Sequence, residues 1–153
     1  MELKKLKINN LDAILDLEAI CFPGEGWKKE DWEDLLTDER STYYAFMDGE
    51  RLVGSTFTYN WKGEHDYVKI MNIAVHPDYR KQGLAHKLMA LVHEEMHTSG
   101  LNRICAETRA SNKAMQKIFD DCGYKRTSVV ENGYDNPQED EYKYVYEAGD
   151  VKA

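Results

Sequence analysis

The sequence lacks the cysteine patterns of a disulfide framework or of a zinc ribbon. Its three cysteines, Cys21, Cys105 and Cys122, are odd in number and form no C-x-x-C pair, so we expect small, buried, free thiols. It also lacks any run of about 20 apolar residues that could span a membrane. The first ten residues carry lysines but no apolar signal core. These absences predict a cytoplasmic protein with no membrane partner.

An excess of positive charge is also missing, because 28 acidic residues outnumber 20 basic ones and give a formal net charge of −8. Such a charge disfavours nonspecific nucleic-acid binding and favours cationic partners such as amines or basic peptides. There are no internal repeats, low-complexity tracts or linkers. With 153 residues, 42% of them hydrophobic, the chain is long enough for one packed domain. We predict that domain over residues 1–147 and a flexible tail over residues 148–153.

The spacing of apolar residues predicts seven strands and four helices. The turn pair Asp48-Gly49 predicts a hairpin between the second and third strands. Because a crossover helix normally links parallel neighbours, the order predicts an α/β chain with a mixed sheet, formally α+β, and helices on both faces. The expected strands are residues 3–8, 42–47, 51–59, 65–75, 103–108, 125–131 and 141–146, and the expected helices are residues 11–22, 27–36, 82–99 and 112–122, the last capped by Ser111 and the second preceded by a loop at 23–26.

Residues 73–85, IAVHPDYRKQGLA, are predicted to form a strand, a tight turn and the start of the longest helix. The first N–H groups of a helix have no intrahelical acceptor and lie at the positive end of the helix dipole. Gly83 permits close backbone approach, and Arg80 and Lys81 add positive charge, so the turn suits a pyrophosphate. Taken alone, a glycine at a helix start is more often structural, and such basic side chains are often only solvated.

The string Arg80-x-x-Gly83-x-Ala85 resembles the acyl-CoA signature Arg/Gln-x-x-Gly-x-Gly/Ala of the GNAT superfamily of N-acetyltransferases. The resemblance extends to other segments, in which the chain is similar to the bacterial ribosomal-protein alanine N-acetyltransferases. It implies the GNAT fold, acetyl-CoA as co-substrate, no metal, and either a monomer or a homodimer. The further segments are Phe22-Pro23 with Trp27, Arg109-Ala110-Ser111-Asn112, Gly123-Tyr124, and Tyr134 with Glu139-Asp140.

By that resemblance, a set of residues is expected to bind the cofactor. Backbone groups of one strand would hold the pantetheine arm, the turn would hold the pyrophosphate, and Asn112 would contact the arm again. The strand residues are Ile73, Ala74 and Val75; the turn residues are Arg80, Lys81, Gln82, Gly83, Leu84, Ala85 and His86; and Phe119 occupies the place of a tyrosine of the related enzymes, beside the expected thiolate.

Acetyl transfer requires a deprotonated amine, a polarised thioester carbonyl and a proton for the leaving thiolate. The resemblance implies that Glu107 is the general base and that a backbone N–H near Ala74 or Val75 polarises the carbonyl. Phe119 cannot donate a proton, so Tyr134 is the first candidate for the acid. The alternatives are a solvated strand-end carboxylate for Glu107 and a core or loop position for Tyr134.

The acceptor that we predict is the N-terminal α-amine of a protein, such as a ribosomal protein. At pH 7 an α-amine of pKa about 7.8 is roughly 10% neutral, whereas a lysine amine of pKa about 10.4 is neutral to under about 0.1%. The acidic run 139–141 would recruit a cationic peptide or is simply solvated. Alternatives are an acetyltransferase for a small amine or antibiotic and a non-catalytic acyl-CoA-binding module.

The segment His93-Glu94-Glu95-Met96-His97 matches the HExxH pattern of zinc hydrolases. On a helical wheel, both histidines lie opposite the apolar stripe that contains Leu88. We therefore expect them to point to solvent and to bind no zinc. The preferred interpretation is a polar helix face, with a zinc hydrolase as the weakest alternative.

Overall fold

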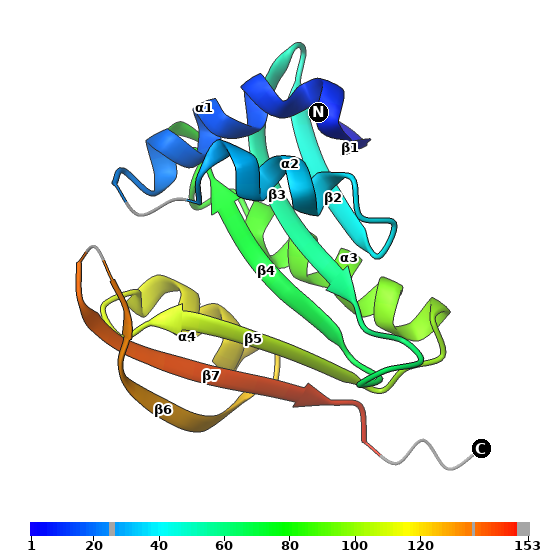
Figure 1. Cartoon of the computed structure of the whole chain (residues 1–153), viewed down its shortest axis with the longest axis vertical. Coiled ribbons are helices and arrows are strands. Elements are labelled where there is room, and N and C mark those ends of the chain that lie inside the picture. The colour runs from blue at the N-terminus through cyan, green and yellow to red at the C-terminus, as the bar shows by residue number, and fades with distance from the viewer. Residues whose placement is uncertain (25–26, 136, 150–153) are drawn as a thin grey trace.

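The computed structural model, which describes residues 1–24, 27–135 and 137–149, is built on one seven-stranded mixed sheet with helices on both faces (Figure 1). This confirms the predicted fold class. The strands are β1 (Glu2–Leu6), β2 (Ser41–Asp48), β3 (Arg51–Asn60), β4 (Val68–Val75), β5 (Arg103–Arg109), β6 (Lys125–Tyr134) and β7 (Glu139–Glu147), and the helices are α1 (Leu11–Cys21), α2 (Lys29–Leu36), α3 (Leu84–Thr98) and α4 (Lys113–Asp121), with 3-10 turns at Ile8–Asn10 and Pro77–Tyr79.

The strand order is β1-β2-β3-β4-β5-β7-β6, and β4 and β5 form the parallel pair. Their ladder consists of Val68 with Ile104 and Lys69 with Cys105. Beyond these rungs the two strands diverge into the V that Figure 1 shows between β4 and β5. The facing backbone edges of the V have no ladder partner within the described residues. Such edges can bind an extended ligand, because N–H and C=O groups need hydrogen-bond partners.

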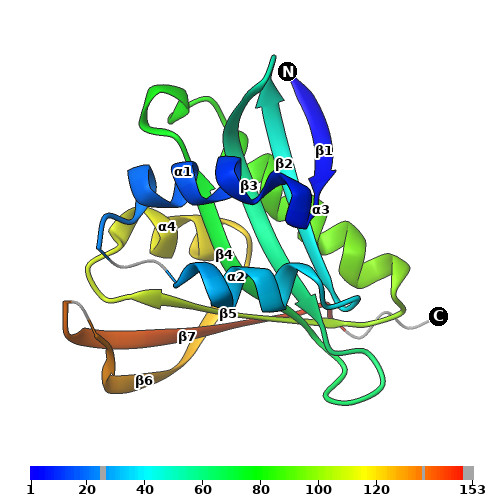
Figure 2. The same cartoon turned by 45° about the horizontal axis from the view of Figure 1, so that its top comes forward.

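Two layers of helices cover the sheet, α1 and α2 on one face and α3 and α4 on the other (Figure 2). The first layer packs around Ile14, Trp32 and Phe57, and the second around Val92 and Ile104. Because helices cover β3 on both faces, seven of its ten residues are buried. The two layers therefore fix β3 and β4 rigidly beside the V.

Local details differ from the sequence-based expectations. Asn112, and not Ser111, caps α4, because its side-chain oxygen accepts a hydrogen bond from the N–H of Met115 at 3.1 Å. The strand expected from residue 65 begins only at Val68, since residues 61–66 form a turn that is closed by hydrogen bonds to the carbonyl of Trp61. The three cysteines are free but only partly buried.

The other expectations concern Trp27, the loop before α2, the C-terminal tail and membrane-spanning helices. Trp27 lies outside α2, although the centroid of its ring is 4.7 Å from that of Trp32. The N–H of Ala148, the first residue of the expected tail, donates to the carbonyl of Asn102 at 2.8 Å. Residues 25 and 26 of the expected loop and residues 150–153 of the expected tail lie outside the described residues. No helix of the described part is long and apolar enough to cross a membrane.

Candidate active site

The turn that joins β4 to α3 adopts a conformation that suits an anion. Gly83 precedes the helix with φ 78°, and Lys81 also has a positive φ of 63°. The first helical hydrogen bond runs from the N–H of Lys87 to the carbonyl of Gly83 at 3.1 Å, so the N–H groups of residues 84–86 come before it. A Cβ on Gly83 would meet no atom within 4 Å, which shows open space in front of this backbone.

The side chains around the turn divide between the core and solvent. Lys81, Gln82 and His86 are exposed, and His86 lies 3.6 Å from Asp121. Leu84 is buried in the core, so it can offer a ligand only its backbone. The exposed Arg80 donates through Nε to the carbonyl of Val75 at 3.1 Å, and the thiol of Cys21 donates to the same carbonyl at 3.5 Å. These two contacts connect the turn and the last residue of α1 to the end of β4.

The open edge of β4 and the N-terminus of α3 are contiguous, because Val75 ends the strand and the turn follows directly. Ile73 and Val75 are partly exposed there, and Ala74 is buried. An extended arm along the edge and a pyrophosphate at the helix N-terminus therefore fit the residues that are present. Asn112 uses its side-chain oxygen to cap α4, and its contact with the arm stays a prediction.

Glu107 lies on the other side of the V, two residues past the last β4–β5 rung. Its Oε1 is 3.0 Å from Nζ of Lys69 on β4, and its Oε2 accepts a hydrogen bond from Nζ of Lys143 on β7 at 2.8 Å. Burial raises the pKa of Glu107, but the hydrogen bond from Lys143 and the charge of Lys69 outweigh burial and lower it. Glu107 is thus an ionised, ion-paired carboxylate rather than a solvated one.

Arg109 fixes the connection between β6 and β7 beside this carboxylate. Its guanidinium donates to the carbonyls of Pro137 at 2.7 Å and Asp135 at 2.9 Å. It also lies 3.3 Å from Glu139, whose carboxylate accepts hydrogen bonds from the backbone N–H and the hydroxyl of Ser111. The N–H of Ser111 is the main cause that lowers the pKa of Glu139. Glu139 therefore holds the loop in place.

Tyr134 ends β6 on the same face, and its ring lies 4.5 Å from the guanidinium carbon of Arg109. Burial and then the charges of Glu107 and Glu141 raise the pKa of Tyr134. The phenol is therefore protonated at neutral pH, as a proton donor must be. The predicted strand ended at residue 131 and left Tyr134 outside it, whereas the structure continues β6 to this residue.

Phe119, the expected neighbour of the thiolate, is 1% exposed. Its ring lies 4.7 Å from Tyr144 and 5.2 Å from Tyr124, in the core layer formed by α3 and α4. The side chain is therefore a core aromatic, and its contact with the cofactor stays a prediction.

The HExxH segment is not a free polar face. His97 is exposed as expected, but the expectation for His93 is wrong. His93 is half-buried, with Nε2 3.1 Å from the hydroxyl of Tyr124 and its ring 4.4 Å from Tyr146, because β7 and the end of α4 pack against this flank of α3. Burial lowers the pKa of His93. The described residues contain no group of three His, Cys, Asp or Glu that could hold a metal ion.

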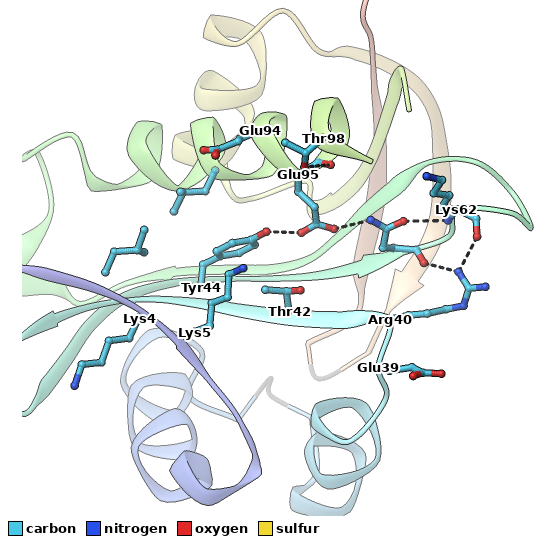
Figure 3. Close-up of a pocket in the computed structure, with 13 residues that line it drawn as sticks. Lys4, Lys5, Glu39, Arg40, Thr42, Tyr44, Lys62, Glu94, Glu95 and Thr98 are labelled. Carbon is cyan, nitrogen blue, oxygen red and sulfur yellow. Dashed lines mark hydrogen bonds between the residues drawn. The ribbon is translucent and has the colours of Figure 1, made fainter. Parts of the chain in front are cut away.

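A hollow of about 660 Å³ lies between the β1–β2 edge and α3, and none of the predicted site residues is among the described residues that line it (Figure 3). The side chains of Tyr44 and Glu95 point toward each other there and form a hydrogen bond of 2.6 Å, and Asn60 donates to the same carboxylate at 3.1 Å. These three polar groups thus bond to one another.

The sequence interpretation missed Lys69, Lys143, Arg109 as a loop anchor, and the position of Glu141 beside Glu107. Strand alternation was the available signal, because it puts Glu107 and Arg109 on one face of β5 and residues 141 and 143 on one face of β7. The pairing of Glu107 with Lys143 then needs the register, which no local pattern in the sequence gives.

Comparison with known proteins agrees with this geometry. Residues 11–124 match the acetyltransferase (GNAT) family. The [ribosomal protein bS18]-alanine N-acetyltransferase of Escherichia coli K12 is 30% identical over 99 residues, 60% of this chain and 67% of that protein. The putative enzyme of the same name from Bacillus subtilis is 25% identical over 137 residues, 90% of this chain and 89% of that protein.

Solved structures show the same fold. The crystal structure of the Escherichia coli ribosomal-protein-S18-alanine N-acetyltransferase superposes with a TM-score of 0.84 at 22% identity, covering 96% of this chain and 93% of that one. Arabidopsis thaliana NAA60 in complex with acetyl-CoA gives a TM-score of 0.82 at 17% identity, with coverage of 95% and 97%. The chain belongs to the acetyltransferase (GNAT) family and is an acetyl-CoA dependent N-acetyltransferase.

Proposed function

We propose that this enzyme acetylates the N-terminal α-amine of a protein, with a ribosomal protein as the first candidate. The observation that carries the proposal is the position of Glu107, an ionised carboxylate at the start of the V and across from the open edge of β4. The names of the relatives from Escherichia coli and Bacillus subtilis support a ribosomal-protein acceptor.

The cofactor-binding part of the proposal uses mainly backbone groups. The open edge at Ile73 to Val75 holds the pantetheine arm, Asn112 contacts it, and residues from Arg80 to His86 surround the pyrophosphate. Acetyl-CoA supplies the acetyl group and the leaving thiolate. A backbone N–H near Ala74 or Val75 donates to the carbonyl oxygen where negative charge develops.

Two side chains move protons in this proposal. Glu107 takes a proton from the amine, and Tyr134 protonates the leaving sulfur. Because burial raises the pKa of Tyr134, its phenol is protonated at neutral pH but is a weak acid. The lowered pKa of Glu107 makes it a weak base. A weak base favours an amine that is already partly neutral, which is an α-amine of pKa about 7.8 rather than a lysine of pKa about 10.4.

The test compares three classes of amine as acceptors for purified enzyme and acetyl-CoA. Turnover is measured as the release of the CoA thiol. We expect turnover with peptides that have a free N-terminus and none with the same peptides after the α-amine is blocked, even when they contain lysine. Spermidine serves as the small-molecule amine. Equal turnover of blocked lysine peptides or of spermidine would contradict the proposed acceptor.

A further inference from the structure

A second carboxyl group, that of Glu141, lies on the same face as Glu107. In the β5–β7 register, Glu107 is opposite Lys143 and Arg109 is opposite Glu141. Because side chains two residues apart share one face of a strand, all four side chains project to the same side of the sheet. Burial and then the charge of Glu107 raise the pKa of Glu141, and a hydrogen bond between the two groups adds to this. The two carboxyl groups therefore titrate together.

The position of Glu141 depends on a glycine in the neighbouring strand. A Cβ on Gly133 would lie 2.7 Å from Cβ and 3.0 Å from Oε1 of Glu141. Gly133 is not among the glycines with positive φ, so the absent side chain matters here for space and not for backbone conformation. The irregular register of β6 between Val130 and Tyr134 brings this glycine to Glu141. The absence of a side chain at Gly133 on β6 thus leaves the space that the Glu141 carboxyl group on β7 occupies.

Glu107 alone is poorly suited to keep a proton. Each of its oxygens is bonded to an ammonium group, from Lys69 at 3.0 Å and from Lys143 at 2.8 Å. Opposite charges at these distances favour the ionised form, so a proton that arrives on Glu107 must move on. The neighbouring carboxyl group on the same face of the sheet is that of Glu141.

We infer that Glu107 and Glu141 act as a carboxyl pair, in which Glu141 takes over the proton that Glu107 removes from the amine. This rests on the proposed role of Glu107. The nitrogen forms its bond to the acetyl carbon, the carbon–sulfur bond breaks with its electron pair on sulfur, and the nitrogen's proton passes through Glu107 to Glu141 and then to solvent. Tyr134 supplies the proton that sulfur gains and recovers a proton from solvent.

The pH dependence follows from the groups around the pair. Glu141 must be ionised to accept a proton, so the rate falls as pH falls through its raised pKa. Without Glu141, the remaining acceptor is Glu107, whose pKa is lowered. The charged and titratable groups that face the pair are Tyr67 before β4, Lys69 from β4, Cys105 and Arg109 from β5, Tyr134 from β6, and Glu139 and Lys143 from β7.

The deciding experiment measures kcat against pH for E141Q with a saturating free-N-terminus peptide. General bases contribute about 10² to 10⁴ in rate, and because Glu107 remains we expect a loss of about 10-fold or more at neutral pH, with the acidic limb moved to lower pH. E147Q is the matched control, since it removes the same charge from an exposed site on the same strand and should behave like the parent.

A second variant, G133A, tests the position of Glu141 without a change in charge. We expect it to lower kcat as E141Q does, and we expect G149A, where a Cβ meets nothing within 4 Å, to leave kcat unchanged. Parental kcat and an unmoved acidic limb in E141Q, with E107Q impaired, would overturn the carboxyl pair and leave the proposed function intact. Loss of the proposed function shows separately, as a parent enzyme that does not acetylate free N-termini.

Discussion

Nζ of Lys69 on β4 lies 3.0 Å from Oε1 of Glu107 on β5, so this ion pair bridges the two strands close to where they separate. Lys69 belongs to the last rung of the ladder, and Glu107 is two residues beyond its partner Cys105. One contact therefore marks the closed end of the V and also keeps the proposed base ionised. Since folding lowers the pKa of Glu107, this contribution to stability is present at neutral pH and is lost as pH falls through the folded pKa.

Replacing Lys69 by Met should raise the pKa values of both Glu107 and Glu141, because the charge of Lys69 lowers each of them. The acidic limb of kcat should then shift to higher pH, by about one unit for the loss of one close opposite charge. The pH profile with a saturating peptide measures this. K117M is the control, because Lys117 is an exposed cation that pairs with Asp121 on α4. An unmoved limb in K69M would show that neither Glu107 nor Glu141 titrates in the rate-limiting step.

Replacing Gly83 by Asp should abolish the stabilisation by acetyl-CoA, because the new carboxylate enters the open space in front of the turn and repels the pyrophosphate. For the parent, a hundredfold excess of acetyl-CoA over Kd should stabilise the fold by about 2.7 kcal/mol. Thermal unfolding with and without acetyl-CoA measures this.

G100D is a matched control for that experiment. Gly100 has φ 74°, close to the 78° of Gly83, and a Cβ there also meets nothing within 4 Å, but it lies at the far end of α3. Both variants carry a similar backbone strain, and only G83D should lose the acetyl-CoA shift. A parental shift in G83D would remove the turn from the cofactor site.

Local patterns in the sequence predicted the element order, the hairpin at Asp48-Gly49 and the turn from β4 into α3, because each depends on neighbouring residues. The chemistry around Glu107 depends on strand register instead. Lys69 and Lys143 are 38 residues upstream and 36 residues downstream of Glu107, and only the sheet brings them together. The prediction that His93 points to solvent was wrong for the same reason, since a helical wheel does not show that Tyr124 and Tyr146 pack against its side chain.

Replacing Phe119 by Tyr should lower the free energy of unfolding without raising the acetylation rate. The ring is 1% exposed and lies between Tyr144 and Tyr124, so the new hydroxyl would be desolvated among aromatic rings. A buried hydroxyl without a partner costs about 1 to 3 kcal/mol. Urea unfolding and thiol-release kinetics measure the two effects. A faster variant of parental stability would place Phe119 beside the leaving sulfur after all.

Chelation should leave the acetylation rate unchanged, because Nε2 of His93 is engaged with the hydroxyl of Tyr124 and the proposed chemistry uses no metal. The measurement is thiol release after dialysis against EDTA, with added Zn²⁺ as the second arm. Activity that disappears with EDTA and returns with Zn²⁺ would restore the HExxH segment as a functional site.

Glu18 should make the protein less stable as pH rises. This carboxyl on α1 is 6% exposed, accepts a hydrogen bond from Asn72 on β4, and has one oxygen without a partner among the described residues. Burial raises its pKa from 4.5 to about 7, against the opposing effect of Asn72. Ionisation is thus disfavoured in the folded state, so stability is fully present below pH 4.5 and declines as pH rises to about 7.

E18Q keeps an oxygen for Asn72 and removes the ionisation, so its free energy of unfolding should change less between pH 5 and pH 8 than that of the parent. A shift from 4.5 to about 7 corresponds to a difference of about 3 kcal/mol at high pH, at 1.36 kcal/mol per unit. Urea unfolding at both pH values measures it, and E33Q, at an exposed position of α2, is the control. If the parent and E18Q lose stability equally across this range, Glu18 does not ionise on unfolding in the way its burial implies, and another buried acid must account for the pH dependence.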